Sequence, residues 1–384
     1  MNQANFSMFE GGAWTRFERA LGLLRRDGRP SVRRILLVSI ALWAPLPILA
    51  SVQSGSFAEA LRLVLGDFAT TVRSLLTVPI LLCAGYWVDR RISFMLRGMT
   101  AEELIPPSHA AAWDVAIEKA RRRMTGAGPL LALAILAVAA SLVLPPQPAS
   151  EAWTTIGPPG QGHLSWAGIW LAALTRPMAF FLILVWLWRW VSLTLLAWAA
   201  ARMPLQLQMG HPDRVGGLAV LGDFAAGSNP MILASGAVVS ANLAWQMVNR
   251  GVELTSLVPV IAGFLILSML YGLGPQLLFA PALIRLRRQG RLAYGALAAK
   301  HARLFEDRWF APGQTTSELL GAPEISSLTD LAASYQLVRT LRPLPFGQST
   351  VVSVLLAALI PMLPVALLEA PLKVILVRLL KVLI

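Results

Sequence analysis

The most constraining feature of this sequence is its series of long apolar blocks. A helix needs about 20 apolar residues to cross the hydrocarbon core of a bilayer. Blocks close to this length or longer cover residues 35–50, 72–90, 128–145, 166–200, 229–248, 254–284 and 349–368. With 56% of its residues hydrophobic and 14% charged, the chain is too apolar for an ordinary soluble domain. The pattern predicts an all-α fold, a polytopic helical membrane protein with about seven transmembrane spans and additional interfacial helices.

Basic residues are concentrated in alternate loops. Of the 33 lysines and arginines, 25 lie in residues 1–34, 89–127, 201–228 and 285–348, whereas residues 145–163 contain none. The positive-inside bias predicts that the four basic segments face the cytoplasm, so the N-terminus is expected there. The net charge of +13 then reflects topology. The expected partners are the lipid bilayer and its anionic headgroups, and no nucleic acid.

On this pattern the chain divides into four parts. Residues 1–34 form a cytoplasmic N-terminal segment, and residues 35–284 form the transmembrane helical domain. Residues 285–348 form a small helical cytoplasmic segment. Residues 349–384 contain the last span and a short C-terminal helix whose basic residues share one side, which is typical of a helix lying in the membrane interface.

Two patterns predict helices outside the spans. In residues 57–76, apolar side chains at helical spacing predict an interfacial helix that runs into the second span. Thr100 and Glu103 fit a capping box, which predicts the start of a helix. The helix that follows has one apolar stripe, formed by Trp113, Ile117, Ala120 and Met124.

Two arginines lie within the fourth apolar block, Arg176 and Arg189. A charge inside a bilayer is costly and usually faces a partner or a wet cavity. Arg189 is either an anchor at the membrane interface, flanked by tryptophans, or a functional charge within the membrane. No span interior contains an acidic residue, which disfavours coupling to protons or sodium through a carboxylate. Any transported ion is therefore expected to be an anion.

The sixth apolar block ends in the stretch YGLGPQLLFAP. Glycine and proline interrupt the helical hydrogen-bond ladder, and freed backbone groups at membrane depth must face protein or water. The stretch is either a broken helix that lines a pathway or a kink near the cytoplasmic end. Its candidate pathway residues are Tyr271, Gly274, Pro275 and Gln276.

The loop between the fourth and fifth blocks contains a His-Pro-Asp sequence followed by two glycines. Proline fixes φ, aspartate can accept hydrogen bonds from the following backbone, and glycine permits positive φ, so the sequence suits a turn. The alternative is a gating or substrate-facing loop at the cytoplasmic mouth. The candidate residues of this loop are His211, Asp213, Arg214, Gly216 and Gly217. The other histidines are scattered and Cys83 is the only cysteine, so neither a metal site nor any cofactor is expected.

No enzyme pattern is found. The sequence lacks a zinc-protease HExxH motif, a GxSxG nucleophile elbow and a phosphate-binding loop. Two stretches, HPDRVGGLAVLGDF (211–224) and LLGAPEISSLTDLAASYQLVRTLRPLPF (319–346), together resemble an uncharacterised family of polytopic inner-membrane proteins of bacteria. The resemblance covers roughly residues 185–384. It implies a bacterial inner membrane and no particular chemistry.

Two classes of function lead, and a third, an enzyme that acts on lipids, stays open although no motif supports it. The first is a channel or uniporter for a small ion, with a preference for anions. The second is a membrane-embedded scaffold or regulator that binds a partner through its cytoplasmic segments. A water-filled path lined by Arg189 or Gln276 would favour transport, whereas an exposed apolar patch on residues 285–348 would favour the scaffold. The small residues Gly236, Ala237, Ser240 and Ala241 allow close helix packing and predict a homo-oligomer.

Overall fold

The computed structural model describes residues 7–9, 12–25, 28–144, 148–157, 162–310 and 323–369. These residues are almost entirely helical, with one pair of short strands, β1 (Thr155–Ile156) and β2 (His163–Leu164). Seven helical stretches among them are long and apolar enough to cross a membrane: Val32–Ser54, Phe68–Ala101, Pro107–Val143, Trp166–Ala201, Leu218–Arg250, Leu254–Leu277 and Gln348–Leu368. The prediction of an all-α polytopic membrane protein is confirmed.

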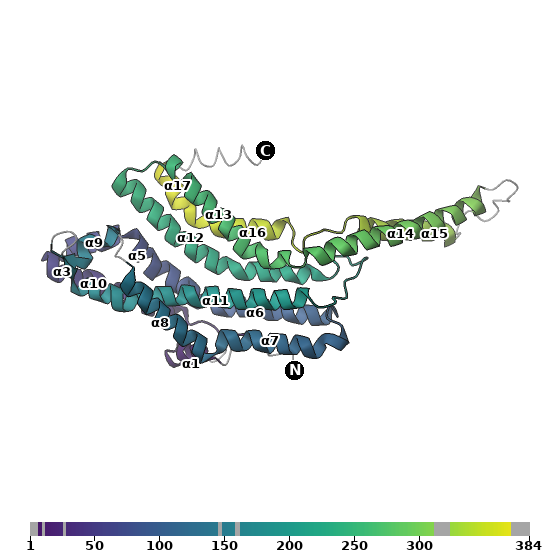
Figure 1. The fold of residues 1–384 in the computed structure, drawn as a ribbon. Coiled ribbons are helices and arrows are strands. Elements are labelled where there is room, and N and C mark those ends of the chain that lie inside the picture. The colour runs from purple at the N-terminus through teal and green to yellow at the C-terminus, as the bar shows by residue number, and fades with distance from the viewer. Residues whose placement is uncertain are drawn as a thin grey trace.

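Three long helices form the centre of the bundle: α6 (Val78–Ala101), α11 (Arg176–Ala201) and α12 (Gly222–Arg250) (Figure 1). Polar side chains join them at membrane depth. The indole Nε1 of Trp186 donates to the carbonyl of Leu81 at 3.0 Å, and the hydroxyl of Thr77 donates to the carbonyl of Ala234 at 3.2 Å. Around this centre lie α2 (Val32–Trp43) and α8 (Ala127–Val143).

A group of short elements lies at one end of the bundle, which we call the far end. It consists of α3 (Pro45–Ser54), α4 (Phe57–Gly66), α5 (Phe68–Val72), α9 (Pro148–Thr154), α10 (Trp166–Trp170) and the strand pair. The carboxylate of Asp67 caps α5 by accepting from the amide of Thr70 at 3.0 Å. Two π-helical segments, η2 (Arg73–Thr77) and η4 (Leu171–Thr175), lead into α6 and α11. Residues 57–76, where an interfacial helix is expected, contain α4, α5 and most of η2, and their interfacial position stays a prediction.

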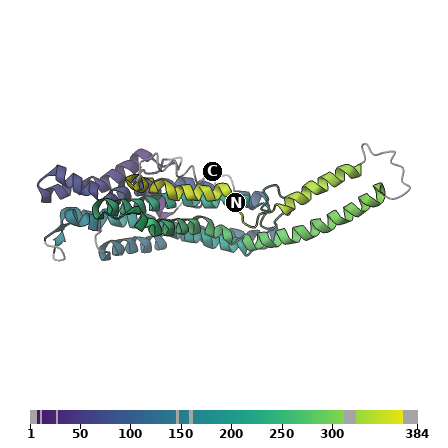
Figure 2. The same cartoon turned by 90° about the horizontal axis from the view of Figure 1, so that it is seen from above.

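A two-helix hairpin projects from the opposite end, which we call the hairpin end (Figures 1 and 2). It consists of α14 (Ala280–Trp309) and α15 (Pro323–Arg339). It follows α13 (Leu254–Leu277) and leads back to the last apolar stretch, formed by α16 (Gln348–Leu359), η6 (Ile360–Met362) and α17 (Leu363–Glu369). The C-terminal helix expected after residue 370 lies outside the described residues.

The segment from η3 (Pro107–His109) through α7 (Ala110–Thr125) packs beside α11 at the hairpin end. Its buried residues are the predicted stripe of Trp113, Ile117, Ala120 and Met124. The capping box was wrong, because α6 continues through Ala101 and the Thr100 hydroxyl donates back to the carbonyl of Leu96. A threonine inside a helix can make this bond to the preceding turn, so its hydroxyl need not cap a new one.

Helices with large exposed apolar side chains identify the surface that faces lipid. On α8 these residues are Leu131, Ile135, Leu136, Val138, Leu142 and Val143, and on α13 they include Ile266, Leu267 and Leu270. By contrast, the small-residue face of α12 is largely covered within the chain. A Cβ atom at Gly236 would lie 3.0 Å from Pro361 and 3.2 Å from Phe264. Close packing at Gly236 therefore serves the bundle itself, and self-association stays a prediction.

Candidate functional site

Arg189 lies on the face of α11 that is covered by the N-terminal segment and α6. Its side chain is only 5% exposed. Its guanidinium carbon is 4.5 Å from the centre of the Phe9 ring and 5.2 Å from that of Trp186. Such cation–π contacts stabilise a guanidinium most where water is excluded. Its Nε atom has no hydrogen-bond partner among the described residues.

Two carboxylates compensate the charge of Arg189. Glu18 on α1 (Ala13–Ala20) and Asp89 on α6 are the acidic groups that act on it electrostatically. Asp89 also anchors the N-terminal segment, because its Oδ1 accepts from the backbone amides of Met8 at 2.7 Å and Phe9 at 3.1 Å. Burial raises the pKa of Glu18 to about 7, although Arg189 acts in the opposite direction.

The space around this cluster is small. A cavity of about 50 Å³ is lined by Arg189, Glu18 and Asp89 together with Phe9 and neighbouring residues of the N-terminal segment. This volume has room for a few water molecules at most. Arg189 is therefore a charge-compensated, covered arginine. The sequence did not predict that the N-terminal segment covers Arg189. The aromatic residues Phe9 and Trp14 in an otherwise basic and polar segment were a signal that this segment packs on the bundle.

The position of Arg189 along the bundle follows from α8. The indole of Trp188 donates to the carbonyl of Arg123, just before α8, at 2.8 Å, and Arg176 donates to the carbonyl of Leu144, just after α8, at 3.2 Å. The lipid-exposed α8 has 17 residues, about 26 Å of helix and close to the hydrocarbon thickness. Arg189 and Arg176 therefore lie near opposite ends of α8, and the choice between an interfacial anchor and a charge within the membrane stays a prediction for Arg189.

Arg176 belongs to a second cluster at the far end. It is 8% exposed and follows the π-helical segment η4. Arg73, at the start of η2, is equally buried, and both guanidinium carbons lie 5.9 Å from the centre of the Phe180 ring. Asp67 acts on Arg73 electrostatically. Insertions of π-helix often occur at functional sites, and here each one places an arginine beside the same aromatic ring.

The sixth-block candidates lie where α13 ends. The ring of Tyr271 stacks on Trp190 at 4.8 Å, and Gln276 is 1% exposed. The Tyr271 hydroxyl and both amide atoms of Gln276 have no hydrogen-bond partner among the described residues. The helix continues through Gly274 and Pro275, and the chain turns at Leu278–Phe279 before α14.

The His-Pro-Asp loop joins three parts of the hairpin end. The carboxylate of Asp213 accepts from the amides of Val215, Gly217 and Ala219 at 2.8–3.1 Å. His211 bridges two carboxylates, with Nε2 2.9 Å from Glu102 and Nδ1 2.8 Å from Asp213. Partial burial acts to raise the pKa of Asp213, but the hydrogen bonds it accepts outweigh this effect and hold the pKa below its usual value.

Backbone geometry in the same loop explains its glycines. Gly216 and Gly217 have φ values of 67° and 96°, and Arg214 has a φ of 60°. A Cβ atom at Gly217 would also lie 2.9 Å from Leu104. Arg342, which follows α15, donates its backbone amide to the carbonyl of Arg214 and its Nη2 to the carbonyl of Asp213. These contacts can hold the end of α6, the His-Pro-Asp loop and the base of the hairpin in fixed positions relative to one another.

Within the described part of the chain, no group of three histidine, cysteine, aspartate or glutamate side chains is placed to hold a metal ion. Comparisons with protein-family models, with curated proteins and with solved structures each found no match to this chain. The fold alone therefore defines its class, an all-α polytopic membrane protein.

Proposed function

We propose that this protein is a membrane-embedded scaffold or regulator that presents the α14–α15 hairpin to a protein partner. The observation that carries the proposal is the lack of a core in the outer hairpin. In α14 the buried residues are Leu283, Leu286 and Gly290, all at its base. Beyond them, no described residue of α14 is buried, and Leu297 and Leu304 are 52% and 60% exposed.

The exposed surface of α14 suggests the chemistry of the partner. Leu297 and Leu304 lie seven positions apart, two turns along one side of the helix, with Lys300 between them. Apolar helix faces of this kind dock in apolar grooves of other proteins. The basic side chains around the leucines favour a groove with an acidic rim. At the hairpin base, the run Arg285 to Arg291 lies beside the bundle, where anionic lipid headgroups would stabilise it.

Photo-crosslinking in bacterial cells that express the chain tests the scaffold. A photoreactive residue at position 297 or 304 should give a discrete adduct with another protein. Position 267 on the lipid-exposed face of α13 is the matched control and should not give that adduct. Leu304→Glu should abolish the adduct formed from position 297. An adduct with a second copy of the chain would support the predicted homo-oligomer instead, and the lack of any adduct would contradict both.

Transport of a small ion with a preference for anions is the second candidate. Its support is two buried polar side chains without hydrogen-bond partners in the described bundle, Tyr271 and Gln276, together with the two buried arginines Arg73 and Arg176. Buried polar atoms without partners are costly unless water or a passing ligand reaches them. Chloride-gradient reversal potentials in proteoliposomes test this candidate. Gln276→Leu should reduce flux if Gln276 lines a path, and Gln53→Leu at the far end is the control.

We further propose that the hairpin end faces the cytoplasm of a bacterial inner membrane, with the N-terminal segment on the same side. The basic residues of 89–127 and 285–348 gather at this end, as the positive-inside bias requires. Membership of the bacterial inner-membrane family that the two quoted stretches resemble also stays a proposal.

A further inference from the structure

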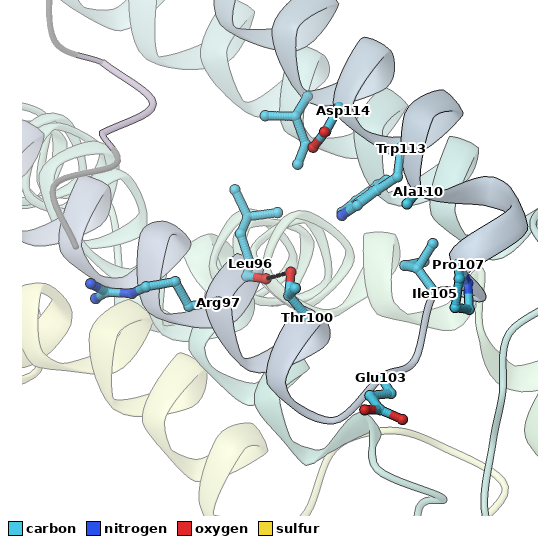
Figure 3. A pocket seen from close by; sticks show the side chains of 10 residues that line it. Leu96, Arg97, Thr100, Glu103, Ile105, Pro107, Ala110, Trp113 and Asp114 are labelled. Carbon is cyan, nitrogen blue, oxygen red and sulfur yellow. Dashed lines mark hydrogen bonds between the residues drawn. The ribbon is translucent and has the colours of Figure 1, made fainter. Parts of the chain in front are cut away.

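A pocket of about 440 Å³ lies between α6 and α7 at the hairpin end (Figure 3). Its walls are apolar side chains, among them Leu96, Ile105 and Ile117. The turn that joins the two helices closes one side. Pockets of about 300 to 1,000 Å³ are typical of small-molecule sites, in which a few polar groups orient the ligand. The pocket lies at the hairpin end of the bundle, on the proposed cytoplasmic side.

One buried donor faces this pocket without a partner. Trp113 is 5% exposed, and its indole Nε1 makes no hydrogen bond to any described residue. Figure 3 shows this nitrogen pointing into the pocket, toward Leu96 and Thr100. Three indole donors on α11, those of Trp186, Trp188 and Trp190, each bond to a carbonyl. A buried N–H without an acceptor costs free energy, so an acceptor oxygen supplied by a ligand would be favoured at this point.

Charged groups of both signs surround the same space. The carboxylate of Asp114, an exposed residue, lies beside Trp113, Glu103 lies at the turn that joins the helices, and the side chain of Arg97 extends away from Trp113 (Figure 3). None of the three forms an ion pair within the described residues. Asp114 is therefore free to bind a cation, and an ammonium group is the cation whose donors match a single carboxylate and a neighbouring hydroxyl such as that of Thr100.

We propose that this pocket binds a small apolar amine that also carries an acceptor oxygen, with an apolar amino acid as the simplest example. The ammonium binds Asp114, the oxygen accepts from the indole of Trp113, and the apolar side chain packs against Leu96, Ile105 and Ile117. This ligand class provides partners for the indole of Trp113 and the carboxylate of Asp114, and the inference does not depend on the hairpin binding a partner.

Binding to the purified protein in detergent tests the proposal, measured by equilibrium dialysis and by the shift in Tm. The probes are L-leucine, L-leucinamide, isoamylamine and 4-methylpentanoate, which share one side chain and differ in their polar groups. L-leucine and L-leucinamide should bind. Isoamylamine lacks the acceptor and 4-methylpentanoate lacks the amine, so both should bind at least tenfold more weakly. A panel of the other apolar amino acids and phosphoethanolamine distinguishes a free amino acid from a lipid headgroup as the source.

Variants locate the site. Asp114→Asn should weaken the binding of L-leucine and of L-leucinamide at least tenfold. Trp113→Phe, which keeps an aromatic ring and removes the N–H donor, should also weaken the binding of both. Asp307→Asn on α14 is the matched control and should change neither. Failure of every probe to bind, or binding that Asp114→Asn and Trp113→Phe leave intact, would overturn the proposal.

Discussion

The guanidinium carbon of Arg189 lies 4.5 Å from the centre of the Phe9 ring, so the N-terminal segment is an integral part of the bundle. Phe9 is held there by Asp89, which accepts from its backbone amide. The same carboxylate compensates the charge of Arg189. The position of the N-terminal segment and the charge of α11 therefore depend on one another.

The first prediction is that Arg189 stabilises the fold through both its charge and its planar shape. Arg189→Gln should lower the free energy of unfolding by about 3 kcal/mol, because removing one member of a buried charge cluster leaves the other charges uncompensated. Arg189→Lys should have a smaller effect, since lysine keeps the charge but cannot stack its head group on Phe9 and Trp186. Thermal unfolding in detergent measures both, with Arg62→Gln at the far end as the control. An unchanged Tm for Arg189→Gln would show that the cover contributes nothing to stability.

The second prediction concerns pH. Burial raises the pKa of Glu18 from 4.5 to about 7 in the folded state, so the folded protein holds a proton that the unfolded chain releases. The associated stability is fully present below pH 4.5 and is lost as the pH rises through 7. It amounts to about 3 kcal/mol at most by proton linkage. The wild-type Tm should therefore decrease as the pH is raised from 5 to 8. Glu18→Gln should flatten this slope, and an equal slope in both proteins would refute the assignment.

The third prediction is that Asp213 is a structural residue of the loop. Its carboxylate accepts hydrogen bonds from three backbone amides. Asp213→Ala would leave these three donors without their partner. We expect a loss of roughly 1–3 kcal/mol and faster hydrogen exchange at residues 215–219. His211→Gln should have a smaller effect, because the His211 ring accepts only one long hydrogen bond from the backbone, at 3.4 Å from the amide of Asp213, besides its contacts with two carboxylates. If exchange in the loop stays unchanged in Asp213→Ala, the loop is held by other contacts.

The class of fold was predictable because every helix that spans a membrane needs about 20 apolar residues to cross the hydrocarbon layer. Apolar length alone identified the seven stretches, and the stripe on α7 followed from helical spacing. The N-terminal cover was not predictable, because Phe9 and Arg189 are brought together by tertiary packing that no local pattern records. The pocket beside Trp113 was missed for a related reason. Trp113 belongs to an apolar stripe, and nothing in the stripe shows that its indole nitrogen lacks an acceptor.

The junction of α13 and α14 shows a second limit. The glycines and prolines there predicted a break or kink, but α13 continues through Gly274 and Pro275 and ends only at Leu277, and the pattern did not show which glycine is needed. A Cβ atom at Gly272 would lie 3.0 Å from Ser228 and Val354, whereas nothing lies within 4 Å of one at Gly274. Which glycine faces a neighbouring helix depends on the rotation of α13 about its axis, and that is determined by its neighbours.

This pair gives the fourth prediction. Gly272→Ala should destabilise the bundle by about 1–3 kcal/mol, because the added methyl overpacks the contact with α12 and α16. Gly274→Ala should be neutral or stabilising by up to about 1 kcal/mol, since alanine favours the helix and meets no neighbour. The two variants differ only in position, so their difference in Tm isolates packing from helix propensity. Equal shifts would show that α13 does not pack on α12 through Gly272.

The fifth prediction is the sidedness of the bundle, on which the proposed role of the hairpin depends. With Cys83 replaced by serine, single cysteines at positions 208 and 300 should be protected from a membrane-impermeant maleimide in intact cells and react after the membrane is permeabilised. Cysteines at positions 151 and 249 should react in intact cells. All four wild-type residues are exposed, so differences in labelling report the side of the membrane rather than burial. The physical reason is the basic charge of the hairpin end, which the positive-inside bias keeps in the cytoplasm. Labelling of position 300 in intact cells would place the hairpin outside, and a cytoplasmic partner would then be ruled out.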